Sequence, residues 1–174
     1  MGYDLALISM EYSDAELRAF VAEYQSGWQR HPQGFRDYDR WVTASRSLAD
    51  AITTVAPDLT QLGHGGDDSW GFPATASYRA PFVLRHSLGI TIHCFEDAAV
   101  VKCALHTNDP LFASESWHQG KVPTAISPGP IAQLCWRVRT NMEPRGSWRL
   151  WDIAGDEFVG SQAGLVTTLS KARK

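Results

Sequence analysis

The sequence contains no block of basic residues, no long apolar run and few cysteines, and each absence excludes a class of protein. Among 174 residues, 16 are Lys or Arg and 19 are Asp or Glu, so the formal net charge is −3. A general nucleic-acid binder needs clustered cations that replace phosphate counterions, and this composition does not supply them. No apolar run approaches the roughly 20 residues that span a bilayer. We therefore expect neither nucleic acid nor membrane as a partner.

The cysteine content points to a reducing compartment. The chain has three cysteines, an odd number, and none forms a CxxC pair. This pattern predicts reduced, buried thiols in a cytosolic protein. A zinc site built from Cys94, Cys103 and histidines would fit no common ligand spacing, so we expect no metal and no cofactor. The N-terminus lacks a positive segment before an apolar one, so we also expect no signal peptide and a cytoplasmic location.

The most regular stretch is 86–107, which predicts two strands joined by a tight turn at Glu96 and Asp97. If Phe95 faces Ala98, one face of this hairpin is wholly apolar, because side chains alternate along a strand. That face carries Leu88, Ile90, Ile92, Cys94, Ala99, Val101, Cys103 and Leu105. It needs another layer packed on it to be stable. The reverse face is mixed, as expected for a sheet that is partly open to water.

Periodic patterns elsewhere predict the layers that complete the fold. Ser13-Asp14-Ala15-Glu16 fits a capping box, in which a hydroxyl and a carboxylate satisfy the first backbone donors of a helix. The other predicted elements are strands at 3–10 and 147–153, a short return strand at 157–159, and a second helix from Asp37 or Asp39 to Pro57.

Residues 131–142 can be read in two ways. Leu134, Trp136 and Val138 alternate, which is typical of a strand. The helical reading places more apolar side chains in one sector, and Pro128 and Pro130 suit a helix entry. We choose the helix.

The resulting order β-α-α-β-β-α-β predicts an α+β fold. With the first two helices counted as one crossover, it is the pattern of a ferredoxin-like sandwich. Right-handed crossovers would place the first strand and the second hairpin strand in the centre of an antiparallel-rich sheet, with the helices on one face. The alternative is a looser α+β sheet of undefined strand order. We expect a single domain over 1–174, with long loops at 58–85 and 108–129 and a frayed tail at 168–174.

Candidate catalytic groups are sparse. Asp67 and Asp68 beside His64 resemble a metal or proton-transfer cluster, but a solvated Gly-rich turn fits the segment better, since calcium-loop spacing is absent. His93, Lys102 and His106 project from the mixed face of the hairpin. They form the alternative site, for a small ligand or a reaction, and this reading predicts a concave pocket with converging polar groups.

Seven Trp residues are the unusual feature of the composition. Trp136 lies about 140° around the predicted helix from Ile131, among polar neighbours. Either the 108–129 loop covers it or a partner does, because Trp is enriched at binding hot spots. Trp70 and Trp117 lie in the two long loops, where each is a loop anchor or a partner contact.

Three short motifs resemble a group of small uncharacterised bacterial proteins that open Met-x-Tyr-Asp-Leu. They are Met1-Gly2-Tyr3-Asp4-Leu5, the hairpin from Leu88-Gly89-Ile90 to Ala99, and Trp151-Asp152-Ile153-Ala154-Gly155, which together cover under a third of the chain. The chain departs from the group at Ile153-Ala154 and in its two long loops. The resemblance implies the same element order and an analogy with immunity proteins encoded beside bacterial toxins.

The leading hypothesis is therefore a non-catalytic binding protein, a cytoplasmic immunity protein that occludes a toxin. Trp70, Trp117 and Trp136 would be its apolar anchors, and Asp67 and Asp68 would pair with a basic toxin surface. No catalytic residue is expected under this hypothesis. The alternatives are the small-ligand or enzymatic site and a homo-oligomeric structural module, and the sequence is compatible with a monomer or a homodimer.

Overall fold

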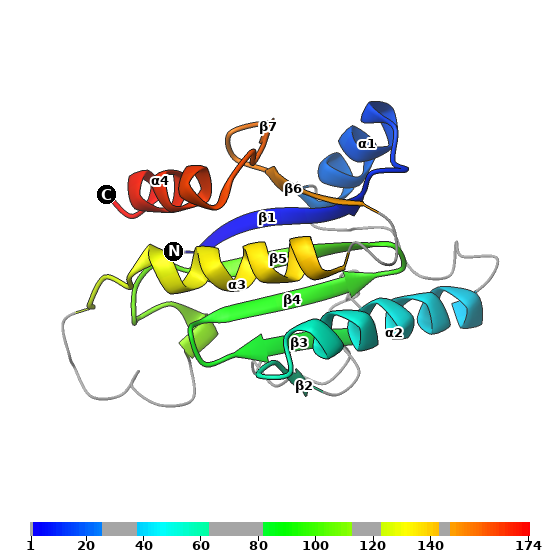
Figure 1. The fold of residues 1–174 in the computed structure, drawn as a ribbon, viewed down its shortest axis with the longest axis horizontal. Helices are drawn as coiled ribbons and strands as arrows, with labels where there is room; N and C mark the ends of the chain where they lie inside the picture. Colours follow the sequence, from blue (N-terminus) through cyan, green and yellow to red (C-terminus); the bar gives the residue numbers. More distant parts are fainter. Residues whose placement is uncertain (1, 26–37, 63–81, 113–122, 143–146) are drawn as a thin grey trace.

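The computed structural model describes residues 2–25, 38–62, 82–112, 123–142 and 147–174. They form an antiparallel seven-stranded sheet with four α-helices, which confirms the predicted α+β class (Figure 1). The strand order is β2-β3-β4-β5-β1-β6-β7. The strands are β1 (Gly2–Ser9), β2 (Thr60–Leu62), β3 (Phe82–His86), β4 (Ile90–Phe95), β5 (Ala98–Ala104), β6 (Trp148–Asp152) and β7 (Glu157–Phe158).

The predicted hairpin is present in its predicted register. In the β4–β5 pair, Phe95 lies opposite Ala98 and Ile90 lies opposite Cys103. Seven of the eight apolar side chains expected on one face belong to the same buried cluster, and Leu88 packs against it. The turn residue Glu96 has φ 53°, which closes the two-residue connection. Alternation along the strands therefore predicted which side chains are buried together.

Three helices also agree with the sequence patterns. At the start of α1 (Asp14–Gln25), the Ser13 amide donates to Glu16 Oε2 at 2.8 Å and the Glu16 amide donates to Ser13 Oγ at 3.2 Å, so the capping box is formed. The second helix is α2 (Tyr38–Val55), and the segment that could be read in two ways is the helix α3 (Pro128–Asn141). Within the described residues, no helix is both long and apolar enough to cross a bilayer.

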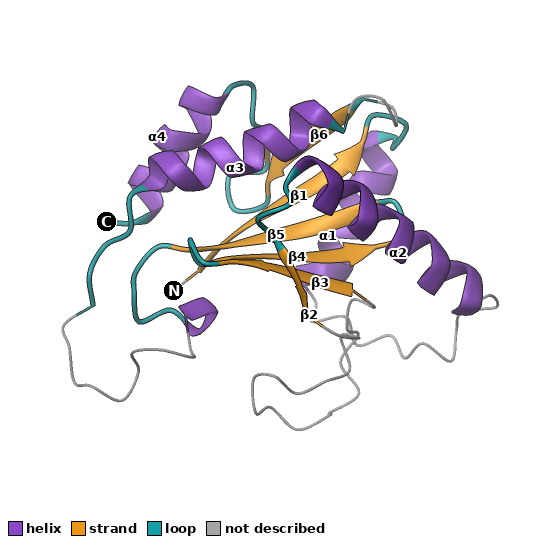
Figure 2. Cartoon of the chain, turned by 60° about the horizontal axis from the view of Figure 1, so that its bottom comes forward, coloured by secondary structure: helices purple, strands orange, loops and turns teal. Residues whose placement is uncertain are grey.

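The expectation that all helices cover one face is wrong. Two apolar clusters lie on opposite sides of the sheet, and α1 supplies the second with Leu17, Phe20 and Val21. Figure 2 shows α1 behind the sheet, on the opposite side from α2 and α3. The reason lies in β1, where the side chains from Leu5 to Ile8 are all 0% exposed. A strand that is apolar on both faces needs a layer on each, and α1 provides the second layer.

Two segments expected to be irregular contain regular structure. The predicted loop 58–85 begins with β2 and ends with β3, which extend the sheet beyond β4. The tail expected to fray at 168–174 is largely the helix α4 (Gln162–Ala172). Ser161 caps it by accepting from the Gly164 amide at 3.0 Å, and Leu165 and Leu169 are fully buried. Apolar side chains four residues apart dock α4, although its last residues are basic.

Candidate functional site

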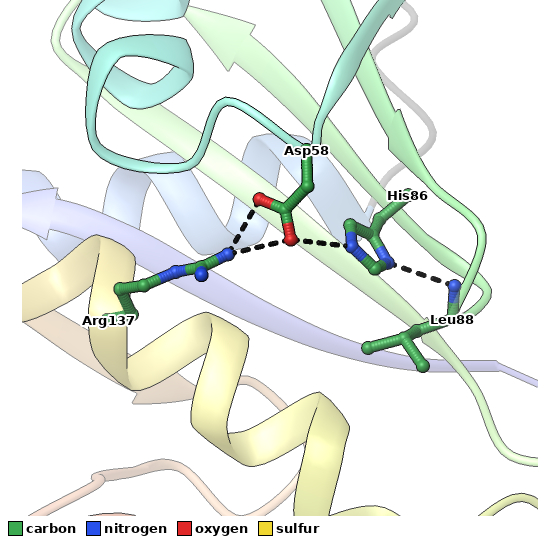
Figure 3. Close-up of polar contacts among 4 residues, drawn as sticks. All are labelled: Asp58, His86, Leu88 and Arg137. Carbon is green, nitrogen blue, oxygen red and sulfur yellow. Dashed lines mark hydrogen bonds and ion pairs between the residues drawn. The ribbon is translucent and has the colours of Figure 1, made fainter.

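The most complete polar cluster joins three separate elements through Asp58 (Figure 3). Asp58 follows α2, His86 ends β3 and Arg137 lies on α3. Arg137 Nη2 is 2.7 and 2.9 Å from the two Asp58 carboxylate oxygens, and His86 Nε2 is 2.9 Å from Oδ2. The cluster therefore ties the α2–β2 connection to the sheet and to α3.

The hydrogen bonds of His86 define its tautomer and limit its chemistry. Its Nδ1 accepts from the Leu88 amide at 3.0 Å, so the ring proton is on Nε2 and is donated to Asp58. The bonds from Arg137, and then from His86, lower the pKa of Asp58 to about 2. Both imidazole nitrogens and the carboxylate are thus engaged. This arrangement is that of a structural clamp rather than a general base.

Two residues of the alternative ligand site, His93 and Lys102, are neighbours on the mixed face, but His106 does not join them. Burial, reinforced by the charge of Lys102, lowers the pKa of His93 to about 3, so this ring is neutral at pH 7. Lys102 Nζ lies 5.8 Å from the Tyr24 ring centroid, and the Tyr24 hydroxyl donates to Asp4. His106 lies past the end of β5 in a bridge with Ala125, roughly 13 Å along the strand direction from Lys102. The mixed face is therefore partly covered by α1, which the sequence did not reveal.

Trp136 is half-buried and packs against the main core. Its outer side is not bare, because the Arg139 guanidinium lies 4.8 Å from its ring centroid. The other four residues predicted to contact a partner lie outside the described residues: Asp67, Asp68, Trp70 and Trp117. Whether a loop covers Trp136 falls outside them for the same reason.

An apolar surface that sequence reasoning missed lies across β6, between the end of β1 and β7. Met10 is 49% exposed and Phe158 is 37% exposed, the two large apolar side chains that stand out on the described part of the chain. The Arg149 guanidinium stacks 4.1 Å from the Phe158 ring centroid, and its Nη2 donates to the Tyr12 carbonyl at 3.1 Å. Because the Met10 amide donates to the Ser147 carbonyl, Met10 continues the β1–β6 pairing beside Arg149. We call Met10, Arg149 and Phe158 the Arg149 surface.

Exposed carboxylates border this surface. The pairing of β1 with β5 places Ile8 opposite Ala98, so the turn after β1 adjoins the turn between β4 and β5. The Tyr12 hydroxyl donates to Asp97 Oδ1 at 2.6 Å and joins the two turns. We call the exposed acidic side chains at this end the acidic rim: Glu11, Asp14, Glu16, Glu96 and Asp97. The Arg149 surface is an apolar patch with a fixed arginine, and negatively charged side chains border it. Such a surface is suited to contact with a basic partner.

The sulfur and metal-binding groups give no further site among the described residues. All three cysteines are free and buried. Burial raises the pKa of the Cys94 thiol well above its usual value, which makes it a poor nucleophile. In the described segments, no three His, Cys, Asp or Glu side chains gather in a way that would hold a metal ion.

Comparison with protein-family models, with curated proteins and with solved structures gave no match. The chemistry of these surfaces is therefore what points to a function.

Proposed function

We propose that the protein is a non-catalytic binding protein, and specifically a cytoplasmic bacterial immunity protein that neutralises a cognate toxin by steric occlusion. The observation that carries the proposal is the Arg149 surface beside the acidic rim. Exposed Met10 and Phe158 offer apolar contact area, and the adjacent carboxylates favour a partner with a basic surface.

The composition of the Arg149 surface supports a protein partner over a small ligand. Aromatic, methionine and arginine side chains are enriched at the centres of protein interfaces. The stacking of Arg149 on Phe158 and its bond to the Tyr12 carbonyl hold the guanidinium in place before binding. Less conformational entropy is then lost when a partner docks, which favours affinity.

The proposal includes a ferredoxin-like core. The four central strands have the order β4-β5-β1-β6, each antiparallel to its neighbours. With α2 and α3 as the crossover helices on one face, this supports the ferredoxin-like arrangement. In this description β2, β3 and β7 extend the sheet, while α1 and α4 are additional helices.

The test is a binding assay with the purified product of the neighbouring gene, together with protection of cells that express that product. We expect Phe158→Ala to weaken binding by about tenfold or more, as for a hot-spot residue. Binding should also weaken as salt is raised, because the acidic rim contributes through charge. Light scattering of the complex gives its stoichiometry and shows whether the free protein is a monomer or a homodimer.

Gln133→Ala is the matched control, because Gln133 is exposed on α3, which packs on the face of the sheet opposite to α1 (Figure 2). This variant should bind like the parent protein. Absence of binding to any neighbouring product, or equal weakening by Gln133→Ala and Phe158→Ala, would contradict the proposal.

A further inference from the structure

A pocket lies between α1 and the β6–β7 hairpin, next to the Arg149 surface. Its volume is about 170 Å³, and it is lined by α1 side chains together with Trp151 and Asp156. A cavity of about 150 Å³ holds a benzene molecule, so this pocket has room for one leucine-sized side chain. Arg18 and Asp156, which both line the pocket, form a 3.4 Å ion pair, and each is 64% exposed, so the pocket reaches solvent on this side.

Trp151, one of the lining residues, carries a buried hydrogen-bond donor without an acceptor. Trp151 is 6% exposed, and its indole Nε1 is buried with no hydrogen-bond partner. The ring is held by an edge-on contact with Phe158, with centroids 4.5 Å apart. Leaving a buried N–H unpaired costs free energy, which a ligand carrying an acceptor would recover.

We infer that this pocket is a subsite for a leucine-like side chain and an adjoining main-chain carbonyl from a loop of the protein partner. The side chain would lie against Leu17, Val21 and Ala22. Because Trp151 Nε1 has less than 1 Å² of exposed surface in the free protein, a small rotation of the ring would let the carbonyl accept from it. The choice of a protein loop rests on the proposed function. It follows from continuity with the Arg149 surface, because Trp151 contacts Phe158 directly.

The pocket can be tested without the partner. The probe is N-acetyl-leucine methylamide, compared with N-acetyl-glycine methylamide, which has the same carbonyls but no side chain. In ¹H–¹⁵N spectra, the Trp151 indole signal is assigned by its loss in Trp151→Phe. We expect the leucine probe to shift it saturably at millimolar concentration, the range for so small a ligand. The glycine probe should leave it in place.

Trp148 supplies the internal control. Its Nε1 is also buried without a partner, but it belongs to the core on the other face of the sheet and does not line the pocket. Its indole signal should not move. If both signals move equally, or if the Trp151 signal does not respond to the leucine probe, the inference is overturned.

Substitutions on the exposed side of α1 give a second test that does not disturb the core. Ala22→Leu places a side chain in the pocket and should weaken probe binding by about tenfold or more, because the site is filled. Ala19→Leu is the matched control, because Ala19 is exposed on the same helix but does not line the pocket. It should bind like the parent.

The same pair of variants identifies the occupant. Weaker partner binding by Ala22→Leu, with Ala19→Leu unchanged, supports a partner loop. Loss of probe binding without any effect on partner binding would show that the pocket takes a free small amide, which overturns the assigned occupant. If no partner exists, the proposed function fails while the probe result still decides the pocket.

Discussion

Replacing Asp58 with asparagine is expected to destabilise the protein by about 1–2 kcal/mol at pH 7. The pKa of Asp58 falls from 3.8 to about 2 in the folded protein, first because of Arg137 and then because of His86. Without solvent screening, this pKa difference corresponds to roughly 2.4 kcal/mol of stability. The Asp58 side chain is 46% exposed, so solvent screening reduces the ionic part to about 1 kcal/mol.

The asparagine amide is also a weaker acceptor for His86 than the Asp58 carboxylate, and this adds to the cost. The His86 side chain is only 11% exposed, and its Nε2 proton is donated to Asp58. An uncharged amide accepts this bond less well and turns an N–H toward the Arg137 guanidinium. A weakened buried hydrogen bond costs about 0.5–1 kcal/mol, which brings the total into the stated range.

The dependence on pH has a definite sign. The carboxyl group binds a proton less readily when folded, so its contribution is complete well above pH 3.8 and is lost as pH falls through about 2. At pH 3 about half of the ionic part should remain. The measurement is urea unfolding followed by Trp fluorescence at pH 7 and pH 3. Urea is chosen because guanidinium salt would screen the ion pair.

Asp50→Asn is the matched control, since Asp50 is an exposed aspartate on α2. It should change the free energy of unfolding by no more than about 0.5 kcal/mol. Combining Asp58→Asn with Arg137→Gln should give less than the sum of the two single effects, because the two residues share one interaction. The reasoning is refuted if Asp58→Asn costs the same at both pH values, or if Asp50→Asn is equally costly.

Three further outcomes follow from local contacts. The thiols of Cys94, Cys103 and Cys135 should stay unreactive toward a chromogenic disulfide reagent until urea unfolds the chain, because all three are buried. A thiol that reacts in the native protein would contradict its placement in the core. Gly89→Ala should cost about 2 kcal/mol or more by thermal unfolding, because Gly89 has φ +74° and an added Cβ would clash with the Phe112 ring. An unchanged unfolding midpoint would count against this placement. Ser13→Ala should cost about 1 kcal/mol in urea unfolding through the lost cap of α1, whereas a cost near zero would mean that the capping bonds contribute little.

Local patterns predicted the elements whose burial follows from the periodicity of one continuous segment. The β4–β5 hairpin alternates strictly, so its register follows from one turn at Glu96. The segment that becomes α3 has more apolar side chains in a helical sector than on a strand face, and the buried side chains of α3 occupy that sector. In both cases the period of burial is a property of a single continuous segment.

The facing of α1 could not be predicted in this way. The spacing of Leu17, Phe20 and Val21 shows which side of the helix is buried, but not which side of the sheet it meets. The decisive feature is elsewhere, in the double-sided burial of β1. Likewise β3 follows a Gly- and Pro-rich stretch whose composition suggested a continuous loop, although Phe82, Val83 and Leu84 are buried in the sheet.

The polar cluster and the Arg149 surface depend on contacts between distant segments. Asp58 and Arg137 are 79 residues apart, and no motif links them. Met10 directly follows β1 and Phe158 ends β7, and at such positions alternation alone does not say whether a further layer covers the side chain. Side-chain exposure at these positions is a property of the assembled sheet. The sequence therefore pointed instead to the Trp-containing loops and to Trp136 on α3.

The position of α1 connects the fold to both proposals. A ferredoxin-like sheet with helices on one face would leave the β1–β6 side of its other face open to solvent. Here α1 packs on that side of the sheet as far as Trp151. A pocket therefore forms between the helix and the β6–β7 hairpin. Beyond that boundary, Phe158 and Met10 remain exposed on either side of Arg149. Because α1 covers the sheet incompletely, a partly apolar recess lies beside Trp151, with its unpaired indole donor, and beside the Phe158 ring on which Arg149 stacks. A protruding partner loop requires this combination.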